Sequence, residues 1–285
     1  MTITQNEKGR IFRALHERQG AFLLPNPWDI GTARLLANLG FEALATTSAG
    51  HAFSMGQQDN TVGRDDLIAH VASIVSATVL PVSADLENGF GDGPEEVAHT
   101  ITLAAAAGVV GGSIEDATGR QDKPIYEEAL AIERIRAAAQ VVRELPFSFT
   151  LTARCENFLV GITDLNATIK RLQAYEQAGA DVLYAPGLSR RADIAAVASS
   201  LSRPLNVVMG LQGCQLDQEE LAAIGVKRIS VGSALSRTAL GSFLRAALEM
   251  RDHGTFTFAD QAVSYQEITA IFKPKTQARE TSGRP

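Results

Sequence analysis

Short apolar runs alternate along this chain with longer stretches in which apolar residues recur at helical spacing. Eight of the short runs are predicted to be buried strands, and a helical pattern follows each. The predicted strands span residues 21–25, 42–47, 80–84, 110–115, 149–154, 182–186, 204–209 and 228–232. Glycines that suit a left-handed helix end separate helix from strand at Gly40, Gly108, Gly179 and Gly225. Eight βα units in about 230 residues predict an α/β fold, a (β/α)8 TIM-type barrel, because an open doubly wound sheet usually has fewer strands.

The barrel is expected to form a single domain over residues 1–272, which begins with an amphipathic helix at 5–19. Residues 273–285 are polar and are expected to form a disordered tail. Just before this tail, apolar side chains recur between Phe256 and Phe272, among them Phe258 and Ile268. That surface must be covered, either by folding back on its own barrel or by docking on another subunit.

Charge and cysteine content narrow the class of protein. The net charge is −6 and the pI is about 5.5, and no basic stripe is present, so no nucleic-acid partner is expected. No apolar run approaches the roughly 20 residues that span a bilayer, so no membrane role is expected. The first 19 residues are charged throughout and lack a signal-peptide core, and the chain has two cysteines. We therefore expect a cytoplasmic protein with reduced thiols.

Charged residues follow three consecutive predicted strands. Asp85 and Glu87 end the third strand, Glu115 ends the fourth and Arg154 ends the fifth. In extended backbone the i, i+2 spacing directs Asp85 and Glu87 to one side, where paired oxygens suit Mg²⁺. Each acidic residue taken alone is better interpreted as a helix cap or part of a solvated turn. The occurrence of such residues after three successive strands instead predicts the active face of a parallel barrel.

Other candidate residues belong to the same face, namely Thr47, Ser48 and Ala49 after the second strand and Asp59 in the loop beyond it. A divalent metal held by carboxylates can act as a Lewis acid on a substrate oxygen, while an arginine binds a carboxylate or an enolate. This combination predicts a metal-dependent site for a small anion.

Five motifs together resemble the isocitrate lyase/phosphoenolpyruvate mutase superfamily, and the resemblance extends from about Pro25 to Phe272. The motifs are Thr46-Thr-Ser-Ala-Gly50, Gly56-Gln-Gln-Asp59, Asp85-Leu-Glu87-Asn-Gly89-Phe-Gly91, Glu115-Asp116 and Ala153-Arg154-Cys-Glu156-Asn157. The resemblance implies a barrel whose eighth helix is exchanged between subunits, usually in a homotetramer.

The resemblance also implies roles for individual residues. Mg²⁺, or Mn²⁺ in its place, would lie near Asp85, Glu87 and Glu115, mostly through water, with a small 2-oxo or 2-hydroxy carboxylate bound to it. The backbone N–H groups of Ser48 and Ala49 would hold the substrate together with Arg154, and Asp59 would lie near the reacting bond. Thr47, Asp85 and Glu156 complete the implied substrate-binding set.

The segment after the fourth strand departs from the family pattern. Isocitrate and methylisocitrate lyases carry Lys-Lys-Cys-Gly-His there, whereas this chain reads Ala117-Thr-Gly-Arg120-Gln-Asp122-Lys123-Pro124. The Lys-x-Asn element of the phosphonopyruvate branch is also missing. We expect residues 117–124 to form a mobile lid, with Arg120 or Lys123 as the cation that meets a distal anionic group. For either residue, a solvated surface turn is an equally good interpretation.

The leading hypothesis for function is a Mg²⁺-dependent lyase that cleaves a carbon–carbon bond next to a pyruvoyl unit through an enolate. One alternative is carbon–phosphorus chemistry of the phosphoenolpyruvate mutase or phosphonopyruvate hydrolase type. Another is a catalytically idle barrel that binds a 2-oxo acid. Asp59, retained beside the carboxylates and Arg154, argues against the idle barrel, because binding alone needs no group at the reacting bond.

Overall fold

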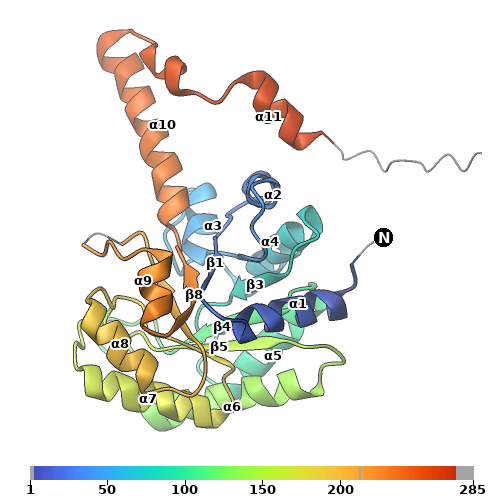
Figure 1. Cartoon of the computed structure of the whole chain (residues 1–285), viewed down its shortest axis with the longest axis vertical. Helices are drawn as coiled ribbons and strands as arrows, with labels where there is room; N and C mark the ends of the chain where they lie inside the picture. Colours follow the sequence, from blue (N-terminus) through green and yellow to red (C-terminus); the bar gives the residue numbers. More distant parts are fainter. Residues whose placement is uncertain (1–2, 212, 274–285) are drawn as a thin grey trace, which may run out of the picture. The chain divides into compact units, whose positions relative to one another are not determined.

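Eight parallel strands form a nearly closed barrel with helices around it (Figure 1). The computed structural model describes residues 3–211 and 213–273. The strands are β1 (Phe22–Leu24), β2 (Leu44–Ala45), β3 (Val82–Asp85), β4 (Gly111–Glu115), β5 (Thr150–Arg154), β6 (Val182–Tyr184), β7 (Leu205–Val208) and β8 (Val226–Ser230). They pair in the order β1-β8-β7-β6-β5-β4-β3-β2. The Ala45 N–H donates to the Pro25 carbonyl over 3.0 Å and so links the two ends of the sheet. The predicted TIM-type fold is confirmed.

Each strand differs from its predicted bounds by one or more residues, and in β2 and β8 side chains end the sheet early. β8 was expected at 228–232 but ends at Ser230, since the N–H groups of Val231 and Gly232 donate to Oδ1 of Asn26 at 2.9 and 3.0 Å. β2 was expected at 42–47 but contains only Leu44 and Ala45, because Thr47 already caps the next helix. In both places a side-chain oxygen at the carboxyl end of the barrel accepts backbone N–H groups just beyond the strand.

Helices follow every strand, and one precedes the first. Their bounds are α1 (Gln5–Glu17), α2 (Ile30–Asn38), α3 (Ser48–Ser54), α4 (Arg64–Ala77), α5 (Pro94–Ala106), α6 (Glu128–Glu144), α7 (Leu165–Ala178), α8 (Arg191–Ser199), α9 (Gln218–Ala223) and α10 (Ala234–His253). The apolar faces of the helices from α2 to α9 pack on the outer side of the strands and form the main core. The strands' inner sides are therefore free to carry polar groups.

Helix α1 lies at the amino end of the strands. Gly9 approaches the backbone before β5 so closely that an added Cβ would lie 2.2 Å from the Ser148 carbonyl oxygen. Phe12 and Leu15 bury their side chains with Phe22 and Leu24 of β1 in a separate apolar cluster. Helix α1 thus covers part of the amino end of the barrel, while barrel enzymes place their chemistry at the carboxyl end.

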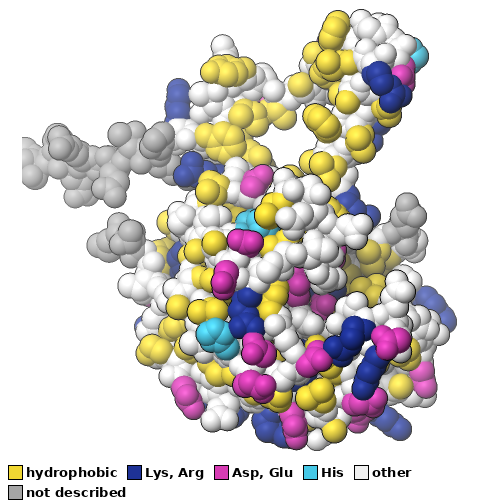
Figure 2. All heavy atoms as spheres, turned by 180° about the vertical axis from the view of Figure 1, so that it is seen from behind, with side chains coloured by type: hydrophobic (Ala, Val, Ile, Leu, Met, Phe, Trp, Pro, Cys, Tyr) yellow, Lys and Arg dark blue, Asp and Glu magenta, His cyan; other side chains and the backbone are white. Residues whose placement is uncertain are grey.

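Contacts divide the chain into two units, Met1–Gly241 and Ser242–Pro285. The second unit holds the later part of α10, a 3₁₀ turn η1 (Thr257–Gln261) and α11 (Tyr265–Phe272). Many large apolar side chains of this unit are exposed in the single chain, and Figure 2 shows apolar side chains along it. They are Phe243, Leu244, Leu248, Met250, Phe256, Val263 and Tyr265.

Of the apolar residues singled out in the sequence, Phe258, Ile268 and Phe272 are half-buried, while Phe256 and Val263 are exposed. Apart from Lys273, the predicted polar tail lies outside the described residues. None of the helices in the described part of the chain has the length and apolar character needed to cross a membrane.

Candidate active site

The carboxyl ends of three neighbouring strands bring Asp85, Glu115 and Arg154 together. The parallel register places Asp85 of β3 opposite Ser113 of β4, and Glu115 of β4 opposite Arg154 of β5. Nη1 of Arg154 lies 3.1 Å from Oε2 of Glu115 and 3.7 Å from Oδ1 of Asp85. The three strand-end residues predicted from the sequence therefore form one cluster.

Glu87 reaches this cluster by a different route from the one expected. β3 ends at Asp85, and Glu87 has a φ of 49°, so the backbone there is left-handed rather than extended. The Glu115 N–H donates to the Glu87 carbonyl over 2.9 Å and holds the turn against β4. The expectation of an extended Asp85–Glu87 segment was wrong, because β3 breaks into its turn one residue earlier than a common face for both carboxylates requires.

Arg134 of α6 fixes the turn that follows. Its buried guanidinium donates to the carbonyls of Gly91 and Asp92 at 2.5 and 2.6 Å, and also to that of Asn88. Gly89 has a φ of 81°, and an added Cβ would lie 3.0 Å from Val97 of α5. The glycine-rich motif after Asp85 is therefore needed for the shape of the turn.

Asp85 is bound by groups from the end of β2. Its Oδ2 accepts the backbone N–H and the hydroxyl of Ser48, at 3.2 and 2.9 Å. The N–H of Asp85 in turn donates to Oγ1 of Thr46 over 2.9 Å. Ser48 and Ala49 begin α3, while Oγ1 of Thr47 accepts the Gly50 N–H and caps that helix. The predicted anion-binding N–H of Ser48 thus lies beside Asp85, and the Thr47 side chain has a capping role.

Arg154 is the central cation of the cluster. Its Nε forms a close ion pair with Glu156, and its guanidinium lies 5.3 Å from the centroid of the Tyr184 ring. Burial alone would lower the pKa of Arg154, but Glu156 and Glu115 raise it well above its usual value. Arg154 therefore stays charged and can offer its N–H groups to an anion.

The carboxyl groups around Arg154 are crowded and poorly solvated. Burial, together with the charges of Asp85 and Asp59, raises the pKa of Glu87 to about 8. Burial also raises the pKa of Glu115 and of Glu156, although Arg154 opposes both shifts. The single positive charge of Arg154 cannot neutralise all the carboxyl groups around it. A bound cation would therefore be electrostatically favourable in this cluster.

This donor set suits Mg²⁺ or Mn²⁺. The available ligands are carboxylate oxygens, which hard cations prefer. Across residues 3–211 and 213–273, no three His, Cys, Asp or Glu side chains form a ready set of direct ligands. Since Mg²⁺ usually keeps several of its waters, Asp85, Glu87 and Glu115 fit it as partners through water.

Asp59 lies at the solvent side of the cluster, with its Oδ1 3.4 Å from the Ser48 hydroxyl and 3.1 Å from the Asn60 N–H. Desolvation by neighbouring atoms, together with the charge of Asp85, raises the pKa of Asp59 although the residue remains accessible. Asp59 is thus positioned to exchange a proton beside Ser48.

Arg120 and Lys123 point to other partners. Nη1 of Arg120 forms an ion pair with Asp92 at 2.8 Å, and Nζ of Lys123 lies 3.4 Å from Glu127. The segment folds as a small hairpin, in which Ala117 bridges Ile125 and the Thr118 N–H donates to the Pro124 carbonyl. Both cations are exposed and engaged outside the carboxylate cluster.

A cavity of about 50 Å³ continues from the cluster into the barrel. Its lining includes Asp85, Arg154, Tyr184, Asn206, Arg228 and Ser230. Tyr184, Asn206 and Arg228 were not among the sequence candidates. Tyr184 ends β6 as Arg154 ends β5, so its place at a strand end was the available signal.

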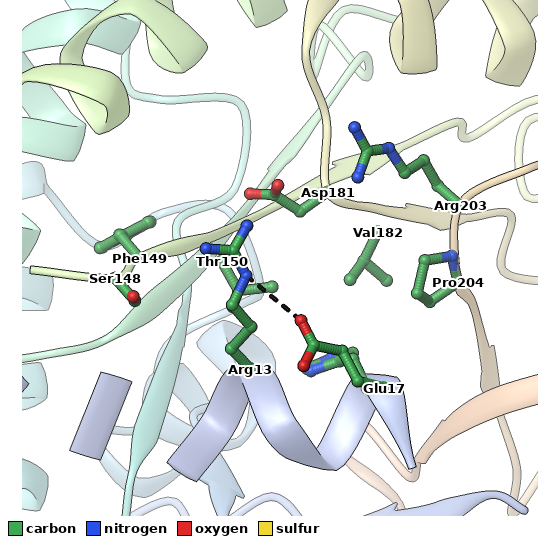
Figure 3. Close-up of a pocket in the computed structure, with 10 residues that line it drawn as sticks. Arg13, Glu17, Ser148, Phe149, Thr150, Asp181, Val182, Arg203 and Pro204 are labelled. Carbon is green, nitrogen blue, oxygen red and sulfur yellow. Dashed lines mark ion pairs between the residues drawn. The ribbon is translucent and has the colours of Figure 1, made fainter. Parts of the chain in front are cut away.

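A larger pocket of about 120 Å³ opens at the opposite end of the strands (Figure 3). Its lining residues precede or begin β5, β6 and β7, as Ser148, Asp181 and Arg203 do. Figure 3 shows Arg13 of α1 in this pocket, where its Nε lies 3.6 Å from Glu17. Because barrel enzymes place their chemistry at the carboxyl end, we assign the active site to the smaller cavity.

Comparison with known proteins gives consistent matches over most of the chain. The phosphoenolpyruvate phosphomutase family model matches residues 12–251. A crystal structure from Burkholderia cenocepacia J2315, provisionally called a lyase/mutase, is 63% identical with a TM-score of 0.93, and the match covers 95% of this chain and 97% of that one. The 2-methylisocitrate lyase of Salmonella typhimurium is 30% identical over 66% of this chain and 68% of the lyase. An oxaloacetate acetylhydrolase, solved with its product oxalate, is 27% identical with a TM-score of 0.83 over 94% of each chain.

Proposed function

This chain belongs to the isocitrate lyase/phosphoenolpyruvate mutase superfamily, and from that premise we propose that it is a Mg²⁺-dependent lyase. Its substrate is a small 2-oxo or 2-hydroxy dicarboxylate, and the bond cleaved joins two carbons next to the pyruvoyl unit. The observation that supports this most is the position of Arg154, 3.1 Å from Glu115 and 3.7 Å from Asp85 at adjoining strand ends. Two relatives named for carboxylate substrates, 2-methylisocitrate and oxaloacetate, agree with this class.

The metal, when bound near Asp85, Glu87 and Glu115, supplies a Lewis acid that polarises a substrate oxygen. Arg154 holds the carboxylate or oxo oxygen of the substrate by charge-assisted hydrogen bonds. The N–H of Ser48 donates to Asp85 at the start of α3, and we assign to it and to the neighbouring N–H of Ala49 the orientation of the same end of the substrate.

Asp59 moves the proton that bond cleavage requires. Burial and the charge of Asp85 raise its pKa, which favours its uptake of a proton, and its contact with the Ser48 hydroxyl would place it beside the bound substrate. In the lyases with the Lys-Lys-Cys-Gly-His loop the cysteine is the proton donor, and residues 117–124 of this chain lack a cysteine. We therefore assign the acid–base role to Asp59 and the exclusion of water to the closing of this segment.

The experiment is a panel assay of pyruvate release with Mg²⁺ from oxaloacetate, 2-methylisocitrate, 2,3-dimethylmalate and phosphonopyruvate, with oxalate release followed in parallel. Turnover of one of the first three supports the proposal. Turnover of phosphonopyruvate alone would assign carbon–phosphorus chemistry instead. Mg²⁺-dependent binding of these acids without any product would assign the idle binding barrel.

We also propose that the protein acts in the cytoplasm as a homotetramer in which α10 and the segment after it dock on a neighbouring subunit. The exposed Phe243, Leu244 and Leu248 of α10 support such docking, since a single chain leaves them in water. Cys155 and Cys214, both free and buried, are consistent with a reducing compartment.

A further inference from the structure

The interior of this barrel is polar where the interior of a TIM barrel is usually filled by branched apolar side chains. Buried hydroxyl and amide groups line it instead, from Ser83, Thr152, Asn206 and Ser230. The Asn206 amide donates to the Ser230 hydroxyl over 3.0 Å. Such an interior suits water or a polar part of a ligand better than it suits simple packing.

Arg228 of β8 is a charged residue in this interior and is only 4% exposed. Its Nε donates to Oδ1 of Asn206 over 2.8 Å, and its Nη2 donates to Oγ1 of Thr152 over 2.9 Å. Burial lowers its pKa to about 10. Among the ion pairs of the described residues, none includes Arg228. A buried cation without a carboxylate partner is costly and calls for an anion that binds there.

His16 of α1 is the third partner of Arg228 and, like Asn206 and Thr152, it carries no charge. Its Nδ1–H donates to the Phe12 carbonyl over 2.8 Å, which leaves Nε2 to accept from Nη1 of Arg228 at 3.5 Å. An arginine has five N–H donors, and these three contacts use one on each nitrogen. Two N–H groups of Arg228 are thus left for a further acceptor.

Arg228 lines the cavity that also reaches Asp85 and Arg154. Thr152, which binds Arg228, lies two residues before Arg154 on β5, so the two contacts are about 7 Å apart along the strand. The cavity of about 50 Å³ holds roughly four waters. A carboxylate with one or two carbon atoms fits that space, whereas a long chain does not.

We propose that Arg228 binds the second carboxylate of the substrate, in the barrel interior beneath Asp85 and Arg154, and so makes the enzyme specific for short dicarboxylates. This inference rests on the proposed function, because it names the distal group of the same substrate. The alternative role of Arg228, that of holding the interior hydrogen-bond network, is an outcome that the experiment distinguishes.

The test is isothermal titration in the presence of Mg²⁺ with three stable probes: oxalate, malate and 2-hydroxybutyrate. Malate and 2-hydroxybutyrate share a four-carbon 2-hydroxy acid and differ only in the distal carboxylate. The wild-type protein is expected to bind malate at least tenfold more tightly than 2-hydroxybutyrate. In Arg228→Gln this preference should fall below threefold, while oxalate affinity changes less than threefold. Arg228→Lys, which keeps the charge, should retain most of the preference.

The outcomes separate the two claims. Equal affinity of the wild-type protein for malate and 2-hydroxybutyrate would overturn the inference. This comparison needs no variant, so it tests the inference even if Arg228→Gln misfolds. A parallel loss of all three probes in Arg228→Gln, with an unchanged melting temperature, would also overturn it. Failure of the wild-type protein to bind oxalate with Mg²⁺ would instead contradict the proposed function itself.

Discussion

Ser48 donates both its backbone N–H and its hydroxyl to Oδ2 of Asp85, at 3.2 and 2.9 Å. This pair joins the start of α3 to the end of β3, so the first and third of the sequence motifs meet at one oxygen atom. Oδ1 of the same carboxyl lies 3.7 Å from Nη1 of Arg154. Both oxygens of Asp85 are therefore held before any ligand binds. These contacts orient the carboxylate in advance for binding a metal.

Replacement of Arg154 should reveal how much the carboxylates depend on it. We expect Arg154→Met to lower the free energy of unfolding by about 3 kcal/mol at pH 8 in EDTA, because buried Glu115 and Glu156 lose their counter-charge. The loss should be smaller at pH 5. Burial raises the pKa of both carboxyls, so they take up protons as the pH falls and then need no cation. Urea unfolding at the two pH values measures this, with Arg154→Lys as the charge-retaining control. An identical loss at both pH values would contradict this electrostatic account.

The 117–124 segment was predicted to be a lid, and its ion pairs suggest how to test that role. Arg120→Ala and Lys123→Ala should each leave the melting temperature nearly unchanged, because exposed ion pairs contribute about 1 kcal/mol or less. If Arg120 leaves Asp92 to meet the substrate, Arg120→Ala should raise KM several-fold, while the matched variant Asp92→Asn should not. Steady-state kinetics on the identified substrate decide the matter. Wild-type kcat and KM in both cation variants would show that the segment plays no catalytic part.

His16 should make stability depend on pH. Burial, reinforced by the charge of Arg228, lowers the pKa of His16 to about 3, whereas in the unfolded chain it is about 6.5. Between these values the unfolded state binds more protons, so the free energy of unfolding falls as the pH falls from 6.5, by at most about 1.4 kcal/mol per pH unit. Denaturant unfolding from pH 7 to 4 should show a shallower slope for His16→Gln than for wild type. The exposed His99 supplies the control, and an equal change of slope in His99→Asn would argue against the assignment.

The C-terminal segment should control assembly. Deletion from Thr255 onward removes Phe256, Val263 and Tyr265, which are exposed in the single chain. We expect aggregates or smaller assemblies, because the surface that these side chains cover in a neighbouring subunit would be opened to water. Light scattering coupled to size-exclusion chromatography gives the mass. A soluble truncated protein that assembles with the same number of subunits as the full chain would show that this segment lies outside the interface.

The strand-end residues could be predicted from sequence because parallel strands place their carboxyl ends on one face, as found for Asp85, Glu115 and Arg154. Glu87 required more, since its left-handed φ depends on the turn that Arg134 holds from α6. Arg228 and Tyr184 were missed for a related reason. Which side chains of β6 and β8 meet inside the barrel is decided by pairing across the sheet, as in the alignment of Arg228 with Asn206, and no local pattern records it.

The sequence also did not predict that Arg120 pairs with Asp92 and Lys123 with Glu127. The composition of residues 117–124 offers no apolar anchor, but a backbone bridge from Ala117 to Ile125 closes the hairpin. Cross-strand backbone contacts of this kind leave little trace in composition. The hypothesis that this segment moves over the site remains a prediction.

The central claim, a Mg²⁺-dependent oxo-acid site built on Asp85, is tested most directly by titrating oxalate into wild type and Asp85→Ala, each with Mg²⁺ and with EDTA. Removing one charge from a crowded carboxyl cluster should leave the fold intact, so an unchanged or higher melting temperature is expected for the variant. The account predicts that wild type binds oxalate only with Mg²⁺ and that Asp85→Ala loses this binding at least a hundredfold. Undiminished Mg²⁺-dependent oxalate binding by Asp85→Ala would contradict it.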